Sequence, residues 1–175
     1  MTHLFRLAAA AAIICVAWSS ERAVIARAQP PTAASDQTLV VAGDVTEALT
    51  LGPSDLKMMP RTTVTVNEEG RQINYEGVLV GELLKRAGAP VGRDLSGKAV
   101  ASYVRASAKD GYQVVFALAE LDPGFTSNDI IVADAIDGKP LFDYQGPLRI
   151  VAPHDKRGAR SIRMLQRIEV ARLVK

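Results

Sequence analysis

Residues 62–88 read TTVTVNEEGRQINYEGVLVGELLKRAG, and this stretch determines much of the local architecture of the chain. Its first five residues are all β-branched, which is typical of a strand. The turn-forming run Glu68-Glu69-Gly70 leads into a second strand at residues 72–75, so a hairpin is expected. Over residues 79–87 the apolar side chains recur at helical spacing, and Gly88 stands where a helix ends. The stretch therefore predicts strand, turn, strand and helix in that order.

Patterns on either side of this stretch add short strands and no sign of a second domain. Asp110-Gly111 lies between two apolar runs, which predicts another hairpin. We therefore expect one strand-rich α+β domain over residues 39–174. The helix at residues 79–87 should bury the side chains of Leu83 and Leu84 against the rest of the domain. The further elements expected are strands at 39–43, 48–51, 99–106, 112–117, 130–133, 148–152 and 164–174, a short helix at 53–57 and a helical turn at 118–121.

The N-terminus has the features of a secretory signal. Arg6 precedes an apolar run at residues 7–17, and Ala26-Arg27-Ala28 provides a small-x-small cleavage site. The run is shorter than the roughly 20 residues that span a bilayer. Residues 1–28 are therefore predicted to be a signal peptide, with no membrane span after its removal and a periplasmic or secreted location. A retained membrane anchor is the alternative. Residues 29–38, rich in Pro, Ala and Thr, are predicted to be a flexible leader.

Charge is balanced over the predicted mature chain but unevenly distributed along it. Residues 1–28 hold three arginines and one glutamate, so residues 29–175 carry 18 basic and 18 acidic side chains. This neutrality argues against binding to nucleic acid through bulk charge. From Asp155 onward the chain becomes strongly basic. The basic residues of this end are Lys156, Arg157, Arg160, Arg163, Arg167, Arg172 and Lys175.

Few side chains suggest a metal or catalytic centre. Cys15, the one cysteine of the chain, lies in the predicted signal peptide, and His154 is the one histidine after it. A single histidine provides no zinc or copper cluster. His154 next to Asp155 could act as a general base, but an exposed loop position explains it more simply. Asp134 and Asp137 could pair or bind a cation, although the following Gly138-Lys139-Pro140 turn accounts for Asp137. We predict no catalytic and no metal-ligating residues.

Four ordered motifs resemble the molybdopterin-binding domain of sulfite-oxidase-type oxidoreductases. Each motif is weak alone, but together they cover about two-thirds of the predicted mature chain in the family's order. The motifs are Tyr75-Glu76-Gly77-Val78-Leu79-Val80-Gly81-Glu82-Leu83-Leu84, Lys109-Asp110-Gly111-Tyr112, residues 131–141 with Asp137-Gly138-Lys139-Pro140-Leu141, and Gly146-Pro147-Leu148-Arg149-Ile150-Val151-Ala152-Pro153 followed by Gly158-Ala159-Arg160-Ser161-Ile162-Arg163. The resemblance implies a single sulfite-oxidase-type fold, with molybdopterin as the family's cofactor.

In that family the closing motif contacts phosphate and pterin. Carried over to this chain, the resemblance implies ligand contacts at Arg149, Gly158, Ser161, Ile162 and Arg163. The residue types suit an anion, because arginine offers forked donors and glycine lets a ligand approach the backbone. We expect Arg149, Ser161 and Arg163 to meet on one concavity lined by backbone N–H groups. Arg149 is the strongest candidate because it interrupts an apolar strand.

The resemblance also implies a metal-binding cysteine, and this chain lacks it. The cysteine should fall among Val66, Asn67, Glu68 and Glu69. Since a soft sulfur ligand is not readily replaced, the leading hypothesis is an exported, metal-free module that binds a small anionic or phosphate-bearing ligand or has an accessory role. A second hypothesis is an active molybdopterin-dependent oxidoreductase using Asn67, Glu68 or no protein ligand. A third is an interaction domain that docks an acidic periplasmic protein on its basic C-terminal face.

Overall fold

The hairpin predicted within residues 62–75 is present, and its second strand is longer than the sequence pattern indicated. In the computed structural model, which describes residues 38–173, β3 (Thr62–Glu68) pairs antiparallel with β4 (Arg71–Leu79). The intervening Glu69 and Gly70 both have positive φ, 52° and 80°, which suits a tight hairpin turn. The predicted signal peptide lies outside the described residues, as does the predicted leader except for Thr38. Both stay predictions.

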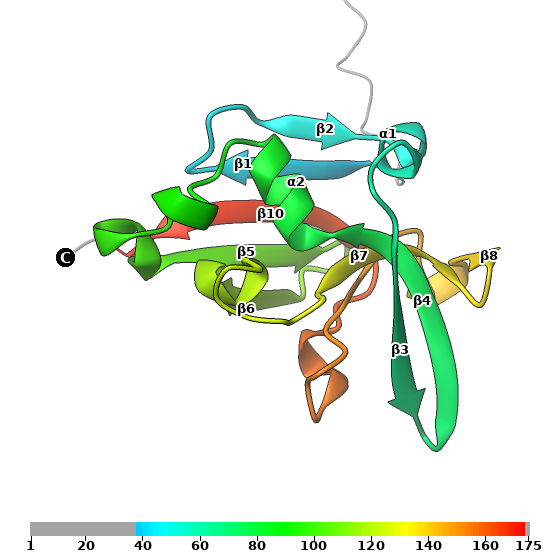
Figure 1. Ribbon diagram of the computed structural model, residues 1–175. Coiled ribbons are helices and arrows are strands. Elements are labelled where there is room, and N and C mark those ends of the chain that lie inside the picture. Colours follow the sequence, from blue (N-terminus) through cyan, green and yellow to red (C-terminus); the bar gives the residue numbers. More distant parts are fainter. Residues whose placement is uncertain (1–37, 174–175) are drawn as a thin grey trace, which may run out of the picture. The chain divides into compact units, whose positions relative to one another are not determined.

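The strands form two five-stranded sheets (Figure 1). The first has the order β2-β1-β10-β5-β6, in which β1 and β10 run parallel and the other neighbours antiparallel. The second has the order β3-β4-β7-β8, with β9 also paired to β7. The remaining strand bounds are β1 Leu39–Gly43, β2 Leu49–Leu51, β5 Ser102–Ala108, β6 Gln113–Ala117, β7 Ile131–Ile136, β8 Lys139–Pro140, β9 Arg149–Val151 and β10 Leu165–Arg172.

Helices are short and connect the strands. The α-helices are α1 (Pro53–Lys57) and α2 (Val80–Arg86), and α2 follows β4 without a loop. Leu83, Leu84 and Ala87 are fully buried, which confirms the apolar face predicted for this helix. The 3-10 turns are η1 Gly92–Asp94, η2 Gly97–Ala101, η3 Leu118–Leu121, η4 Asp143–Gln145 and η5 Gly158–Arg160.

The predicted start of β5 was wrong. The strand expected at residues 99–106 begins only at Ser102, because η2 occupies residues 97–101. The N–H of Ala99 donates to the carbonyl of Ser96 at 3.0 Å, which closes a tight helical turn. Buried and less buried residues alternate only from Ser102 onward, where β5 pairs with β10 and β6. Alternation, rather than apolar character, therefore marks where this strand starts.

Two apolar clusters hold the strands together. The larger cluster joins α2 to residues of both sheets, and the smaller lies under the β3–β4 hairpin. The smaller cluster is built from the fully buried Tyr75 together with Val64, Ile131, Ala133, Leu141 and Val151. Figure 1 shows the β3–β4 hairpin and the orange segment after β9 extending from the sheets in the same direction. The strand-rich α+β fold class predicted from the sequence is confirmed. The hairpin and the segment after β9 lie where they can form the two walls of a pocket.

Candidate functional site

The five predicted ligand-binding residues line one pocket. Its volume is about 680 Å³, and we call it the β3–η5 pocket after the elements that form two of its walls. The hairpin tip contributes one wall, the segment between β9 and β10 contributes another, and the β5–β6 turn and η4 complete it. The residues lining it are Val66, Asn67, Glu68, Glu69, Asp110, Tyr112, Tyr144, Arg149, Ala152, Asp155, Lys156, Gly158, Ala159, Ser161, Ile162, Arg163 and Met164. The structure thus brings these residues together, and whether they bind a ligand stays a prediction.

Arg149 is held by protein partners on several sides. It lies on β9 and is only 4% exposed. Its guanidinium donates to the Tyr75 hydroxyl at 2.6 Å, to Gln145 Oε1 at 2.7 Å and to Glu68 Oε1 at 3.1 Å. It also lies over the Tyr75 ring, 4.7 Å from the centroid. Its Nε is buried and has no hydrogen-bond partner among the described residues. The charge is therefore paired, but the side chain keeps one unpaired donor.

Tyr75 and Glu68 complete the surroundings of this arginine. The Tyr75 hydroxyl donates to Glu68 Oε1 at 3.1 Å, so one carboxylate oxygen receives both the phenol and the guanidinium. Burial is the largest cause that raises the pKa of Tyr75, while the positive charge of Arg149 opposes it. The phenol therefore stays neutral at ordinary pH and acts as a hydrogen-bond donor. The three side chains form a connected polar group beneath the pocket.

The closing motif contributes differently from its prediction. The N–H of Ser161 donates to the carbonyl of Gly158 at 3.0 Å, and that of Ile162 to the carbonyl of Arg160 at 3.0 Å. The Ser161 N–H is therefore used within the η5 turn and is not free for a ligand in this conformation. The Ser161 hydroxyl accepts from the N–H of Ala152 at 3.1 Å and keeps its own hydrogen to donate. Open space beside Gly158 permits close approach to the backbone there.

Arg163 and Lys156 bring unpaired positive charge to the pocket. Both are exposed, and neither forms an ion pair with the described residues. The Arg163 guanidinium lies over the Tyr144 ring, 4.9 Å from its centroid. Glu69 and Asp110 line the pocket as well, so its charge is mixed. The carboxylates of Glu68 and Glu69 belong to the hairpin tip, while the two unpaired cations belong to the segment between β9 and β10.

Arg160 fixes this segment, and sequence reasoning missed that role. Its Nε and one terminal nitrogen donate to the two carboxylate oxygens of Asp155 at 2.8 and 2.7 Å, and its other terminal nitrogen donates to Glu120 at 2.7 Å. It also lies over the Phe116 ring, 4.7 Å from the centroid. The hydrogen bond to Asp155 is the main cause that raises the pKa of Arg160. Glu120 lies 40 residues away in sequence, so no local pattern pointed to this contact.

The other candidate residues have structural roles or lie elsewhere. His154 is exposed and does not line the pocket. Asp134 accepts two hydrogen bonds from Arg61, at 2.9 and 2.5 Å. Asp137 accepts from the backbone N–H of Asn74 at 3.0 Å. Across residues 38–173, no three histidine, cysteine or carboxylate side chains are grouped to hold a metal ion.

The positions where the resemblance implies a metal-binding cysteine do line the β3–η5 pocket. They are Val66, Asn67, Glu68 and Glu69, at the end of β3 and in the following turn. None is a thiol, and the Glu68 carboxylate is engaged by Arg149 and Tyr75. The residues present therefore fit an anionic group beside the cationic segment, but they do not fit a thiolate-held metal.

A second pocket of about 660 Å³ lies among α2, η1 and the segment after η3, and we call it the α2–η3 pocket. Next to it lies Asp122, which is 2% exposed. One Asp122 oxygen accepts from the N–H of Gly124 at 2.7 Å, and the other accepts from the N–H of Gly92. The lining combines apolar residues with a mostly acidic rim. It consists of Leu79, Gly81, Glu82, Lys85, Val91, Gly92, Asp94, Leu121, Asp122, Pro123, Thr126, Ser127, Asn128, Asp129 and Ile130.

Comparison with known proteins identifies the family. Residues 67–174 match the family described as the oxidoreductase molybdopterin binding domain. Among solved structures, the chain is similar to the sulfane dehydrogenase SoxCD from Paracoccus pantotrophus, with a TM-score of 0.62 and 21% sequence identity. The similarity covers 81% of this chain but only 39% of that chain. No curated protein matches the sequence significantly.

The family match extends over more than half of the chain, so the protein belongs to the oxidoreductase molybdopterin-binding-domain family. The resemblance predicted from the four sequence motifs is confirmed, and so is the sulfite-oxidase-type fold. Among the described residues, no helix has the length and apolar character needed to cross a membrane.

Proposed function

We propose that this protein is an exported, metal-free module whose β3–η5 pocket binds a small anionic or phosphate-bearing ligand, either as its own function or as an accessory to an oxidoreductase. The observation that carries the proposal is the pair of unpaired cations on the pocket wall. The Arg163 guanidinium lies over the face of the Tyr144 ring. Neither Arg163 nor Lys156 has an ion-pair partner among the described residues. Unpaired cations beside a hydroxyl donor suit an oxyanion.

The arginine beneath the pocket supports the same ligand class. Arg149 is buried and retains an unpaired Nε donor among the described residues, although Glu68 balances its charge. An unpaired buried donor costs about 1–3 kcal/mol. A modest shift of this side chain toward a bound oxyanion would give that donor a partner. In this proposal Arg149 and Ser161 lie beneath the ligand, while Arg163 and Lys156 close over it.

Absence of a pocket thiol supports the metal-free part of the proposal. The one cysteine of the chain is Cys15, within the predicted signal peptide, so the family's thiolate ligand has no counterpart. Molybdopterin, when bound in this family, supplies a redox-active metal centre. Here the residues near the corresponding position are an amide and a paired carboxylate, Asn67 and Glu68.

A ligand titration tests the anion site. We expect inorganic phosphate, and pterin phosphates more strongly, to raise the melting temperature of the purified protein. Arg149→Ala should largely remove this shift. Arg172→Ala is the matched control, because Arg172 pairs with Asp44 at 2.8 Å and does not line the pocket.

The interaction-domain hypothesis makes a different prediction for the same experiment. If the basic face acts as a whole, Arg167→Ala and Arg172→Ala should reduce binding as much as Arg149→Ala. In the structure Arg167 lies 3.6 Å from the carboxylate of Glu169, and Arg172 is also ion-paired, so both charges are partly neutralised. Equal small effects for all three variants would contradict the anion pocket.

Metal analysis tests the alternative that the protein is an active molybdopterin-dependent oxidoreductase. The observation that favours this alternative is that Asn67 and Glu68 lie on the pocket wall. Protein purified from the exported fraction should contain no stoichiometric molybdenum. Molybdenum at one atom per chain would overturn the metal-free proposal. N-terminal sequencing of the same sample tests export, since cleavage after Ala28 is expected.

A further inference from the structure

Strand β3 is an exposed sheet edge with an unusual length for this molecule. It pairs with β4 on one side and with no described strand on the other. In the view of Figure 1, β3 lies to the left of β4, and the two strands form the long hairpin at the lower right. It has seven residues, whereas the other edge strands among the described residues, β2, β6, β8 and β9, have five or fewer.

The register identifies which backbone groups of this edge lack partners. Glu68 pairs with Arg71 across the two-residue turn. In such a hairpin the pair flanking the turn exchanges hydrogen bonds, and the pairs alternate along the strand. The backbone groups of Thr63, Thr65 and Asn67 therefore point away from β4. All three side chains are exposed, while Val64 is buried.

Natural sheets usually protect such an edge, and residues 62–67 of β3 lack those protections. Proline, lysine, a bulge or an inward-pointing charge normally disrupts pairing by another strand. The β3–β4 register runs without a shift from Thr62 to Glu68, and residues 62–67 contain no charge and no proline. By contrast, the short edge strand β8 contains Pro140. An unprotected edge of this length is available to pair with another strand.

We propose that the partner is β3 of a second copy of this chain, paired antiparallel about a two-fold axis at Thr65. In that register Thr65 faces its own counterpart and Thr63 faces Asn67. These are the residues with free backbone groups, so every outward pair would exchange hydrogen bonds. Val64 would then face Val66 on the same sheet surface. A two-fold interface requires such self-complementarity.

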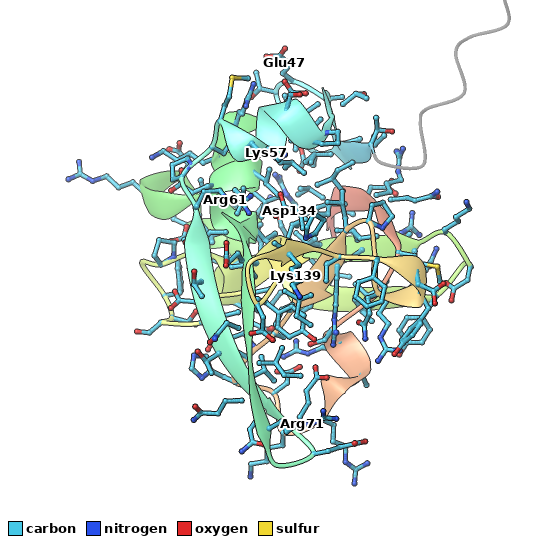
Figure 2. All side chains as sticks on the ribbon, turned by 90° about the vertical axis from the view of Figure 1, so that its right-hand side faces the viewer. Glu47, Lys57, Arg61, Arg71, Asp134 and Lys139 are labelled. Carbon is cyan, nitrogen blue, oxygen red and sulfur yellow. The ribbon has the colours of Figure 1, made fainter. Side chains whose placement is uncertain are left out.

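Charges at the two ends of β3 fit the same register. Arg61 precedes the strand and Glu69 follows it, so the antiparallel register places each arginine opposite the glutamate of the other copy. Figure 2 shows Arg61 and Asp134 near one another at one end of the hairpin and Arg71 at the opposite end. Arg61 pairs with Asp134 and retains donors for a second carboxylate. A parallel pairing would instead bring like charges together.

Sedimentation velocity of the purified protein tests the proposal. One added strand pair gives a small interface, so we expect a dimer whose fraction rises with concentration. Thr65→Lys places two lysines against each other at the two-fold axis and should give a monomer that still melts cooperatively. Thr50→Lys is the matched control, an exposed threonine in the edge strand β2 of the other sheet, and it should still dimerise.

Charge pairing and hydrogen exchange provide two further readouts. Mixing Thr65→Lys with Thr65→Glu should restore dimers, because opposite charges then meet at the axis. The amides of Thr63, Thr65 and Asn67 should become protected as wild-type concentration rises. A wild-type chain that stays monomeric at every soluble concentration would overturn the proposal. So would a dimer in which these three amides exchange freely, or one that Thr65→Lys does not affect.

Discussion

The β3–η5 and α2–η3 pockets have nearly the same volume, about 680 and 660 Å³, and each adjoins a buried charged residue. They differ in how that charge is stabilised. Next to the α2–η3 pocket, backbone N–H groups of Gly92 and Gly124 donate to the two oxygens of Asp122. Beneath the β3–η5 pocket, side chains stabilise Arg149 and leave its Nε unpaired among the described residues.

This difference indicates that Asp122 has a fixed structural role, whereas Arg149 can change its hydrogen-bond partners. Backbone donors are fixed by the fold, so Asp122 closes the connection between η1 and the segment after η3. Side-chain partners can rotate, and the neighbouring Arg163 and Lys156 have no counter-charge among the described residues. We therefore expect mutations at the first site to change stability alone, and mutations at the second to change anion binding.

Asp122→Ala should cause the largest loss of folding stability. A small loss would contradict the distinction drawn between Asp122 and Arg149. The change leaves the N–H groups of Gly92 and Gly124 without their acceptor inside the protein. We expect a loss of about 3 kcal/mol in the free energy of unfolding, measured in urea, because each charge-assisted bond contributes roughly 1.5–3 kcal/mol. Asp94→Ala, an exposed acid on the same pocket, is the control. The phosphate-induced shift in melting temperature should remain.

Glu68→Gln should reduce stability and strengthen anion binding together. It removes the counter-charge of Arg149, which is 4% exposed. Breaking a fully buried pair costs about 3–5 kcal/mol, and a carboxylate that is 33% exposed should cost less, about 1–2 kcal/mol. Phosphate should recover more melting temperature in this variant than in the wild type, because it replaces the lost charge. Glu47→Gln, which changes an exposed acid that lines neither pocket, should behave like the wild type. A Glu68→Gln variant that responds to phosphate no more than wild type would show that Arg149 does not face the ligand.

Arg163→Ala should leave stability nearly unchanged while weakening the anion site. The side chain is exposed and its one described contact is the Tyr144 ring. Loss of one charge-assisted bond of roughly 1.5 kcal/mol corresponds to about tenfold weaker phosphate binding by calorimetry. Arg157→Ala provides the comparison, since Arg157 belongs to the same segment but does not line the pocket. Equal affinities for the two variants would make the site a diffuse charged surface.

Glu169→Gln should cause the smallest change in stability. It measures how much an ion pair outside both pockets contributes. Its hydrogen bond from Arg105 lowers the pKa of this carboxyl below its ordinary value of 4.5. A lowered pKa in the folded state adds stability above the unfolded pKa, and that stability is lost as pH falls through the folded value. Wild type and Glu169→Gln should therefore differ slightly at pH 7 and converge in strong acid. Melting temperatures of both proteins measured over a series of pH values test this expectation. A difference in melting temperature that grows toward low pH would contradict a lowered pKa of Glu169.

Local pattern was sufficient for much of this fold. The β3–β4 hairpin, the buried face of α2 and the β5–β6 turn all follow from alternation, helical spacing and turn residues within short windows of the chain. The sequence also indicated that Arg149 was unusual, because a charge within an apolar strand needs a partner. It showed directly that no cysteine stands near the end of β3.

Only the tertiary structure decided which partners those residues have. Arg149 meets Tyr75 and Glu68 across 74 and 81 residues of sequence, and Arg160 meets Glu120 across 40. The η5 turn uses the Ser161 N–H, and β3 is an edge only because of the order of strands in its sheet. Secondary structure depends on neighbours a few residues apart, whereas pairing between distant side chains depends on how whole sheets pack.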